Sequence, residues 1–276
     1  MKTLLIAGYG DIARRAAPQL AGRFSIKPLS RRHGADLDRP DCLARLASAD
    51  AVLHCAPPPA RGVADPRTAN LLDALEKGGI LPARFVYVST SGVYGDCAGA
   101  RIDETRPLRP QTDRARRRAD AESQVARWCS ERSIPWVILR VPGIYAEDRL
   151  PLERLRAAVP VLRPEDDVFT NHVHAEDLAA IVVRALEDGA PPGIYNASDD
   201  SELRAGDWMD LVADRCGLPR PPRIARAEAA LRVPAETLSF LGESRRLVND
   251  RLKSRLGVRL RFPTVHEGLP PARAAA

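Results

Sequence analysis

The stretch LLIAGYGDIARRAAPQL, residues 4–20, decides the fold of this chain. A short apolar run ends at Gly8, and Gly10 opens a segment whose apolar residues recur at helical spacing. With Ala13, the two glycines form a GxGxxA pattern between a strand and a helix. The first glycine permits a tight turn, and the second lets the backbone approach a pyrophosphate at the helix N-terminus. An ordinary glycine turn is the alternative, but the position directly after the first strand favours a dinucleotide site.

The rest of the chain alternates short apolar runs with amphipathic segments. Strands are expected at residues 3–8, 25–30, 49–56, 84–91, 135–143 and 193–200, and helices at 11–21, 66–79, 113–131 and 174–188. This alternation is typical of an α/β fold with a doubly wound parallel sheet of the Rossmann type. We expect the Rossmann domain over residues 1–165, completed by the helix and strand at about 171–197, and a smaller, mostly helical substrate lobe over 198–276.

Composition places the chain among ordinary globular proteins. Hydrophobic residues make up 45% and charged residues 28% of its 276 residues. No apolar run approaches the roughly 18 residues that cross a membrane, and the run at the start is too short for a signal peptide. The five cysteines form no CxxC pair, so we expect reduced thiols, a cytoplasmic location and no metal site.

The net charge of +6 raises the question of nucleic acid as a partner. Only four of the 42 basic residues are lysines, a bias that a GC-rich genome explains. No basic run contains interleaved aromatic residues, so nucleic-acid binding is not expected. An anionic cofactor suits the same charge.

The end of the second expected strand bears on the choice of cofactor. A site for NAD usually has an acidic residue here, which accepts the ribose hydroxyls. This chain has Ser30, Arg31 and Arg32 instead, with Asp36 and Leu37 farther along the adenine edge. Guanidinium groups fit a 2′-phosphate, so the sequence favours NADP over NAD. The alternative is a solvated arginine pair in an arginine-rich chain.

Several further motifs follow along the chain. They are STSGVYGD (89–96), ILRVPGIYA (138–146), NHVHAEDLAAIVVRALE (171–187), GIYNASDD (193–200) and SRRLVNDRLKSRLGVRLRFPTVHEGL (244–269). With these motifs in this order, the chain resembles the extended short-chain dehydrogenases/reductases, which include nucleotide-sugar epimerases and dehydratases. The resemblance runs almost from end to end. It implies a Rossmann domain with a small C-terminal lobe that binds the substrate.

The resemblance also implies a catalytic set of Ser/Thr, Tyr and Lys, and here the chain departs from the family. Thr90 stands at the Ser/Thr position. If Glu122 is the acid that commonly follows the lysine by four, Arg118 occupies the lysine position and Arg114 the tyrosine position. Arg118 can still offer a cation to a ribose. Arg114 cannot shuttle a proton at neutral pH, because a guanidinium does not lose its charge.

Other side chains are candidates to replace the missing acid. Tyr94 lies on the loop after Thr90 and is one candidate, and His174 is more simply a helix cap. Arg114 and Tyr145 are expected to line the substrate pocket. The full set expected at the cofactor is Gly8, Tyr9, Gly10, Asp11, Ile12, Ser30, Arg31, Arg32, Asp36, Leu37, Cys55, Ala56, Pro57, Ser89, Arg118 and Pro142.

These residues lead to two hypotheses about function. The first is an NADP-binding oxidoreductase or epimerase/dehydratase-like enzyme that acts on a small carbonyl, alcohol or sugar derivative. The second is a catalytically inactive NADP(H)-binding sensor. Thr90 and the substrate-lobe motifs favour the first, and the lost tyrosine favours the second. The expected partners are a dinucleotide and a small molecule, with neither nucleic acid nor membrane, and a homodimer is left open.

Overall fold

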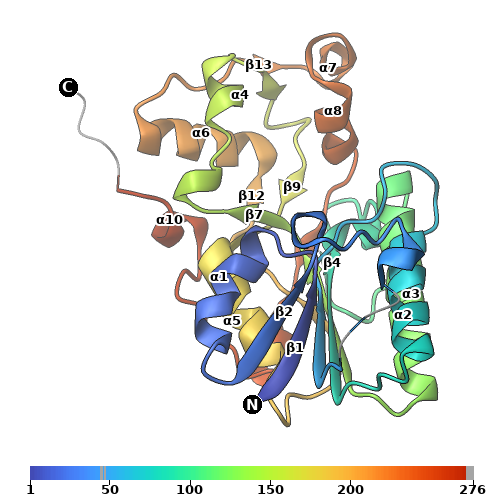
Figure 1. The fold of residues 1–276 in the computed structure, drawn as a ribbon. Helices are drawn as coiled ribbons and strands as arrows, with labels where there is room; N and C mark the ends of the chain where they lie inside the picture. The colour runs from blue at the N-terminus through green and yellow to red at the C-terminus, as the bar shows by residue number, and fades with distance from the viewer. Residues whose placement is uncertain (44–45, 47, 272–276) are drawn as a thin grey trace.

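A parallel sheet forms the centre of the molecule in the computed structural model, which describes residues 1–43, 46 and 48–271 (Figure 1). Its strands are β1 (Lys2–Ala7), β2 (Phe24–Leu29), β3 (Ala51–His54), β4 (Arg84–Thr90), β6 (Trp136–Val141) and β11 (Gly193–Asn196). Their order is β11-β6-β4-β3-β1-β2, and each neighbouring pair is parallel. The expected α/β fold with a doubly wound sheet is therefore confirmed.

Helices cover both faces of this sheet. α1 (Asp11–Leu20) and α5 (Ala175–Ala185) pack together on one face, and α2 (Pro66–Lys77) and α3 (Asp113–Glu131) lie on the other (Figure 1). The apolar residues of each helix recur every three or four positions, which places them on the side that packs against the strands. Within the described part of the chain, no helix is both long and apolar enough to span a membrane.

The direction in which the chain crosses the sheet reverses at β1, which lies between β2 and β3. In such sheets a crevice opens at the carboxyl ends of the strands at the point of reversal. The Gly8 N–H donates to the carbonyl of Leu29 (2.9 Å), and the Cys55 N–H donates to the carbonyl of Ala7 (2.7 Å). These bonds hold the ends of three strands around one crevice.

Pro142 divides the strand that was expected over residues 135–143. β6 ends at Val141, and β7 (Gly143–Tyr145) leaves the sheet to pair in parallel with β10 (His172–His174). Proline has no N–H to donate to a neighbouring strand, so the ladder ends naturally at this residue. The chain is thereby directed from the sheet toward the second lobe.

The second lobe lies above the carboxyl edge of the sheet (Figure 1). Its helices are α4 (Leu152–Arg156), α6 (Ala205–Cys216), α7 (Arg226–Arg232) and α8 (Ala235–Leu241), and its paired strands are β8 (Val161–Leu162), β13 (Arg223–Ile224), β9 (Phe169–Thr170) and β12 (Leu203–Arg204). The remaining elements are β5 (Arg101–Ile102), β14 (Arg246–Leu247), α9 (Asp250–Ser254) and α10 (Val265–Gly268).

The contacts of residues 152–162 bear on the domain boundary expected at residue 165. β8 pairs with β13, and Leu155 of α4 shares an apolar cluster with Met209 and Val212 of α6. The segment that contains α4 and β8 was assigned to the Rossmann domain, but it packs with the C-terminal residues. The reason is that its apolar side chains find their partners more than forty residues later in the chain.

Candidate functional site

A cavity of about 380 Å³ opens at the reversal point of the sheet, and we call it the glycine-turn cavity. Eleven of the residues expected at the cofactor line it: Gly8, Tyr9, Gly10, Ser30, Arg31, Arg32, Asp36, Leu37, Cys55, Ala56 and Pro57. Four lining residues were not expected: Arg14, Leu29, Ala35 and Arg67. The strand ends and the turn that follows β2 therefore bring together residues from four separate segments of the sequence.

Glycine suits the two positions of the turn for different structural reasons. Gly8 has a φ of +87°, and a Cβ added there would lie 2.3 Å from the backbone nitrogen of Ala56. Gly10 has an extended backbone, and a Cβ added there would meet nothing within 4 Å. Gly10 is also the N-cap of α1 and has no side chain to satisfy the first N–H groups of the helix. Those groups are left for a ligand such as a phosphate.

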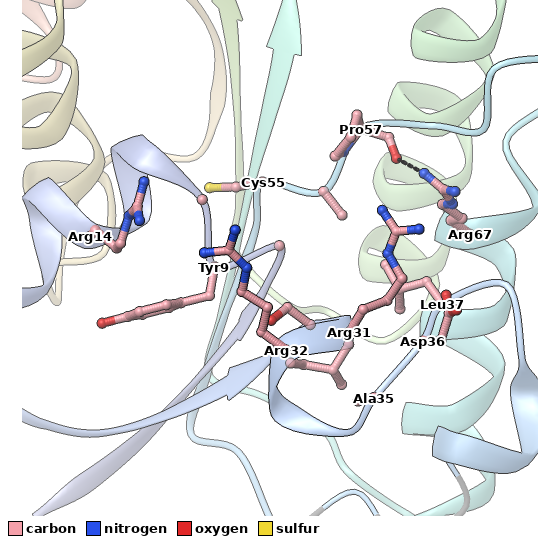
Figure 2. A pocket seen from close by; sticks show the side chains of 15 residues that line it. Tyr9, Arg14, Arg31, Arg32, Ala35, Asp36, Leu37, Cys55, Pro57 and Arg67 are labelled. Atoms are coloured by element: carbon pink, nitrogen blue, oxygen red, sulfur yellow. Dashed lines mark hydrogen bonds between the residues drawn. The ribbon is translucent and has the colours of Figure 1, made fainter. Parts of the chain in front are cut away.

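The charge in the glycine-turn cavity is strongly positive. Arg67 is engaged, because its guanidinium binds both carboxylate oxygens of Asp38 at 2.7 and 2.6 Å. This hydrogen bonding with Arg67 holds the pKa of Asp38 below its usual value. Arg14 approaches from α1, and Arg31 and Arg32 approach from the turn after β2 (Figure 2). For these three arginines, residues 1–43, 46 and 48–271 supply no ion-pair partner.

A second cavity of about 510 Å³ lies between the Rossmann domain and the lobe, and we call it the interlobe cavity. Thr90, Arg114, Pro142 and Tyr145, all expected at the site, line it. The Oγ1 of Thr90 accepts a hydrogen bond from the N–H of the residue two positions later (3.3 Å), and the described residues provide no acceptor for its own proton. The guanidinium of Arg114 stacks on the ring of Phe240 from α8, 4.1 Å from the ring centre.

Arg118 lies behind the wall of the glycine-turn cavity. Its Nη1 donates to the carbonyls of Ala56 (3.4 Å) and Val88 (3.1 Å) and to the hydroxyl of Tyr87 (3.1 Å). The side chain therefore ties the carboxyl ends of β3 and β4 together. It reaches the backbone of Ala56, which lines the cavity.

Glu122 lies four residues after Arg118 on α3, but its ion-pair partner is on another element. Its carboxylate forms a buried ion pair with Arg140 of β6 (2.8 Å) and accepts a hydrogen bond from Ser89 Oγ (2.6 Å). Arg140 is 3% exposed, and the low dielectric of the interior strengthens the direct attraction between its charge and the carboxylate. Ser89, expected at the cofactor, is thereby engaged in the core.

Tyr94 does not occupy a position that supports a role as proton donor. The ring is 1% exposed, and its hydroxyl donates to Oδ1 of Asn196 at 2.8 Å. Burial raises the pKa of Tyr94 to about 12. The hydroxyl of Tyr145 likewise points into the protein, toward the carbonyl of Thr264 (3.3 Å). Both hydroxyls are therefore hydrogen-bonded inside the protein in this arrangement.

Two more expected cofactor residues direct their side chains elsewhere. Asp11 binds Arg15 (3.1 Å) and Arg149 (2.9 Å), and Ile12 is buried in the core between α1 and the sheet. His174 caps α5, because its Nδ1 accepts a hydrogen bond from the backbone N–H two residues later (3.2 Å). This cap agrees with the simpler interpretation of that histidine.

The sequence offers more reason to expect Arg14 in the glycine-turn cavity than Arg67. Arg14 follows the glycine pattern directly on α1, so its position next to a phosphate site was open to inference. Arg67 lies in the first turn of α2, far along the sequence from the glycine turn, and no local pattern connects it to the cavity. Among the residues that the structure describes, no group of three or more His, Cys, Asp or Glu side chains is placed to hold a metal ion.

Comparisons with known proteins agree with the fold. The model of the NAD dependent epimerase/dehydratase family matches residues 4–198. A solved structure of a functionally unknown conserved protein from Silicibacter pomeroyi is 30% identical, with a TM-score of 0.79 and coverage of 97% of this chain and 96% of that chain. The structure of RMD from Pseudomonas aeruginosa complexed with NADPH is 21% identical, with a TM-score of 0.74 and coverage of 97% and 96%, and it supports the fold.

Curated relatives match over a shorter region. The dTDP-D-glucose 4,6-dehydratase of Mus musculus is 25% identical over 176 residues, which are 54% of this chain and 49% of the relative. The chain thus spans about half the length of the curated relatives it matches. The family match covers the strands, the glycine turn and the Thr90 strand end that build the two cavities. The chain belongs to the NAD-dependent epimerase/dehydratase family, within the extended short-chain dehydrogenases/reductases.

Proposed function

We propose that this chain is an NADP(H)-dependent oxidoreductase or epimerase/dehydratase-like enzyme that acts on a small carbonyl, alcohol or sugar derivative. The observation that carries the proposal is the glycine-turn cavity, where a bare helix N-terminus faces Arg14, Arg31 and Arg32. A dinucleotide with an additional phosphate supplies the negative charge that this cavity lacks. The five free cysteines are compatible with a cytoplasmic location.

The residues of the glycine-turn cavity fit such a cofactor. The open space at Gly10 admits a pyrophosphate, and Arg31 and Arg32 would bind the 2′-phosphate. Burial raises the pKa of the Cys55 thiol to about 12, so this wall of the cavity stays uncharged. The nicotinamide end would extend past Ala56 toward Pro142 in the interlobe cavity.

When bound, the nicotinamide supplies hydride chemistry, and the chain must hold the reacting oxygen. Thr90 has a free hydroxyl proton in the interlobe cavity, and Arg114 offers a permanent cation there. Both would donate to the substrate oxygen and stabilise negative charge on it. Arg114 orients and stabilises but does not move a proton. Arg118 would position the cofactor through the strand ends that it ties together.

A turnover screen tests this proposal. NADPH oxidation is followed by absorbance with a panel of aldehydes, ketones, sugar phosphates and nucleotide sugars, the last because dTDP-D-glucose dehydratases are among the relatives. Turnover that is lost in Thr90→Val and Arg114→Ala, with NADPH binding retained, is the expected result. Turnover that persists in both variants would contradict the assigned roles.

A second candidate function has one observation in its favour. The hydroxyls of Tyr94 and Tyr145 are both bonded inside the protein, so neither offers a phenol proton to the interlobe cavity. An NADP(H)-binding sensor without turnover needs no such proton. Tight NADPH binding with no oxidation across the whole panel would favour the sensor.

A further inference from the structure

Arg154 is an unpaired cation in the lobe wall of the interlobe cavity. It lies on α4, and its Nε is buried without a hydrogen-bond partner. In the described part of the chain, its guanidinium forms no ion pair with a carboxylate. Arg156, two residues later on the same short helix, is exposed and binds Glu153 at 2.6 Å. The two arginines therefore differ in their environment although they share a helix.

Most other charged groups of the cavity are matched, and only Arg114, which stacks on Phe240 in the Rossmann wall, shares with Arg154 the lack of a carboxylate partner among the described residues. Arg245 pairs with Glu243 at 2.9 Å, and Arg149 pairs with Asp11 at 2.9 Å. Asp167 accepts two backbone N–H groups at 2.7 and 2.8 Å. Each of these groups has a charged or hydrogen-bonded partner inside the protein. The charge of Arg154 thus remains without a counter-ion in this wall.

A half-buried cation without a partner, such as Arg154, carries a free-energy cost for the folded protein. Burial lowers the pKa of Arg154, but a guanidinium keeps its charge even so. A desolvated charge without a partner destabilises the native state, and such groups persist where a ligand needs them. An anion that entered the cavity would offset this cost.

A second group in the same cavity also lacks a partner. The ring of His172 is 4% exposed, lines the cavity, and has a buried Nδ1 with no hydrogen bond. The ring stacks on Trp208, another lining residue, with 4.4 Å between the ring centres. Burial lowers the pKa of His172 to about 3, so the imidazole is neutral. It can offer one N–H beside an aromatic wall.

We propose that Arg154 binds an anionic group of the substrate, a phosphate ester or a carboxylate, at the lobe end of the interlobe cavity. This inference rests on the proposed use of that cavity for a small substrate. The reacting oxygen would then lie toward Thr90 and Arg114 on the opposite, Rossmann wall. A substrate held in this way carries its reactive carbon and its anionic group at different positions. Neutral sugars and alcohols would bind poorly.

The test measures anion binding separately from turnover. The protein is saturated with NADP⁺, so that the arginines of the glycine-turn cavity are occupied, and is titrated at constant ionic strength with glucose 6-phosphate, glucuronate or glucose. The melting temperature should rise with one or both anions and remain unchanged with glucose. The two anions distinguish a phosphate ester from a carboxylate as the preferred group. A wild-type protein that responds to neither anion would overturn the proposal.

Variants assign the effect to one side chain. Arg154→Met should weaken binding of the preferred anion at least tenfold, and Arg154→Lys, which keeps the charge, should weaken it less. Arg156→Met is the matched control on the same helix and should leave the affinity unchanged. Equal losses in Arg154→Met and Arg156→Met, or wild-type affinity in Arg154→Met, would overturn the proposal.

The ligand-free proteins give a second readout. Without anion, Arg154→Met should melt at or above the temperature of the wild type, because the unpaired charge is gone. A clear decrease would mean that Arg154 supports the fold, and would overturn the assignment. The affinity for NADP⁺ should be the same in Arg154→Met and wild type. Absence of NADP⁺ binding in the wild type would count against the proposed function instead, so the two failures are distinguishable.

Discussion

Substitution of Gly8 should mainly lower the stability of the protein, whereas substitution of Gly10 should mainly weaken NADPH binding. In Gly8→Ala, a φ of +87° costs about 1–2 kcal/mol for a residue with a side chain. The new Cβ would lie 2.3 Å from the Ala56 nitrogen, and relief of that overlap costs about 1–3 kcal/mol more. We therefore expect a loss of about 2–5 kcal/mol, a large part of the roughly 5–15 kcal/mol that holds a domain folded.

Gly10→Val should leave the stability within about 1 kcal/mol, because its backbone is extended and nothing lies within 4 Å of the added Cβ. The valine side chain would fill the space proposed for the pyrophosphate, so the Kd for NADPH should rise about a hundredfold or more, equivalent to about 2.7 kcal/mol.

Urea unfolding measures the first effect, and fluorescence titration with NADPH measures the second. Gly22→Val is the control, because it also adds a side chain in open space, away from the cavity. Wild-type NADPH affinity in Gly10→Val would refute the assignment of the cavity. Wild-type stability in Gly8→Ala would refute the structural role of the turn.

Three further substitutions test other parts of the site. Tyr94→Phe removes the bond to Asn196 and should lower the free energy of unfolding by about 1–2 kcal/mol without affecting turnover; a fall in kcat would make Tyr94 a proton donor after all. Arg118→Ala removes three hydrogen bonds and should weaken NADPH binding by about 1–2 kcal/mol, and unchanged affinity in a titration would confine its role to the fold. Burial raises the pKa of Asp199 to about 7, above that of the unfolded chain, so its favourable contribution is lost as pH rises from about 4 to 7. The free energy of unfolding of Asp199→Asn in urea should therefore rise relative to that of wild type as the pH increases across that window. A difference between the two proteins that stays constant with pH would contradict the raised pKa of Asp199.

Local patterns predicted the glycine turn and the long helix well. The extended backbone at Gly10 and the positive φ at Gly8 follow from the sequence of one turn. The helix expected over residues 113–131 has those bounds in the structure, because Thr112 caps it through a bond from the Ala115 N–H (3.2 Å). Such features depend on neighbours within a few residues, so they can be inferred from one sequence.

Contacts between distant segments were not predictable in the same way. The spacing of Arg118 and Glu122 suggests a helical pair, but Arg140 from a neighbouring strand competes for the carboxylate and wins because the pair is buried. Tyr94 is enclosed through Asn196, about a hundred residues away. Arg154 reaches the interlobe cavity because a segment before β10 folds onto the C-terminal helices. No short motif carries that information.

The most direct test of the cofactor site is the relative affinity of the protein for NADPH and NADH, measured by calorimetry under identical conditions. Pairing of Arg31 and Arg32 with the 2′-phosphate predicts that NADPH binds about tenfold to a hundredfold more tightly, and that Arg31→Asp reverses the preference. Equal affinities for the two dinucleotides in the wild type, or binding of neither, would contradict the assignment of these arginines to an NADP(H) site.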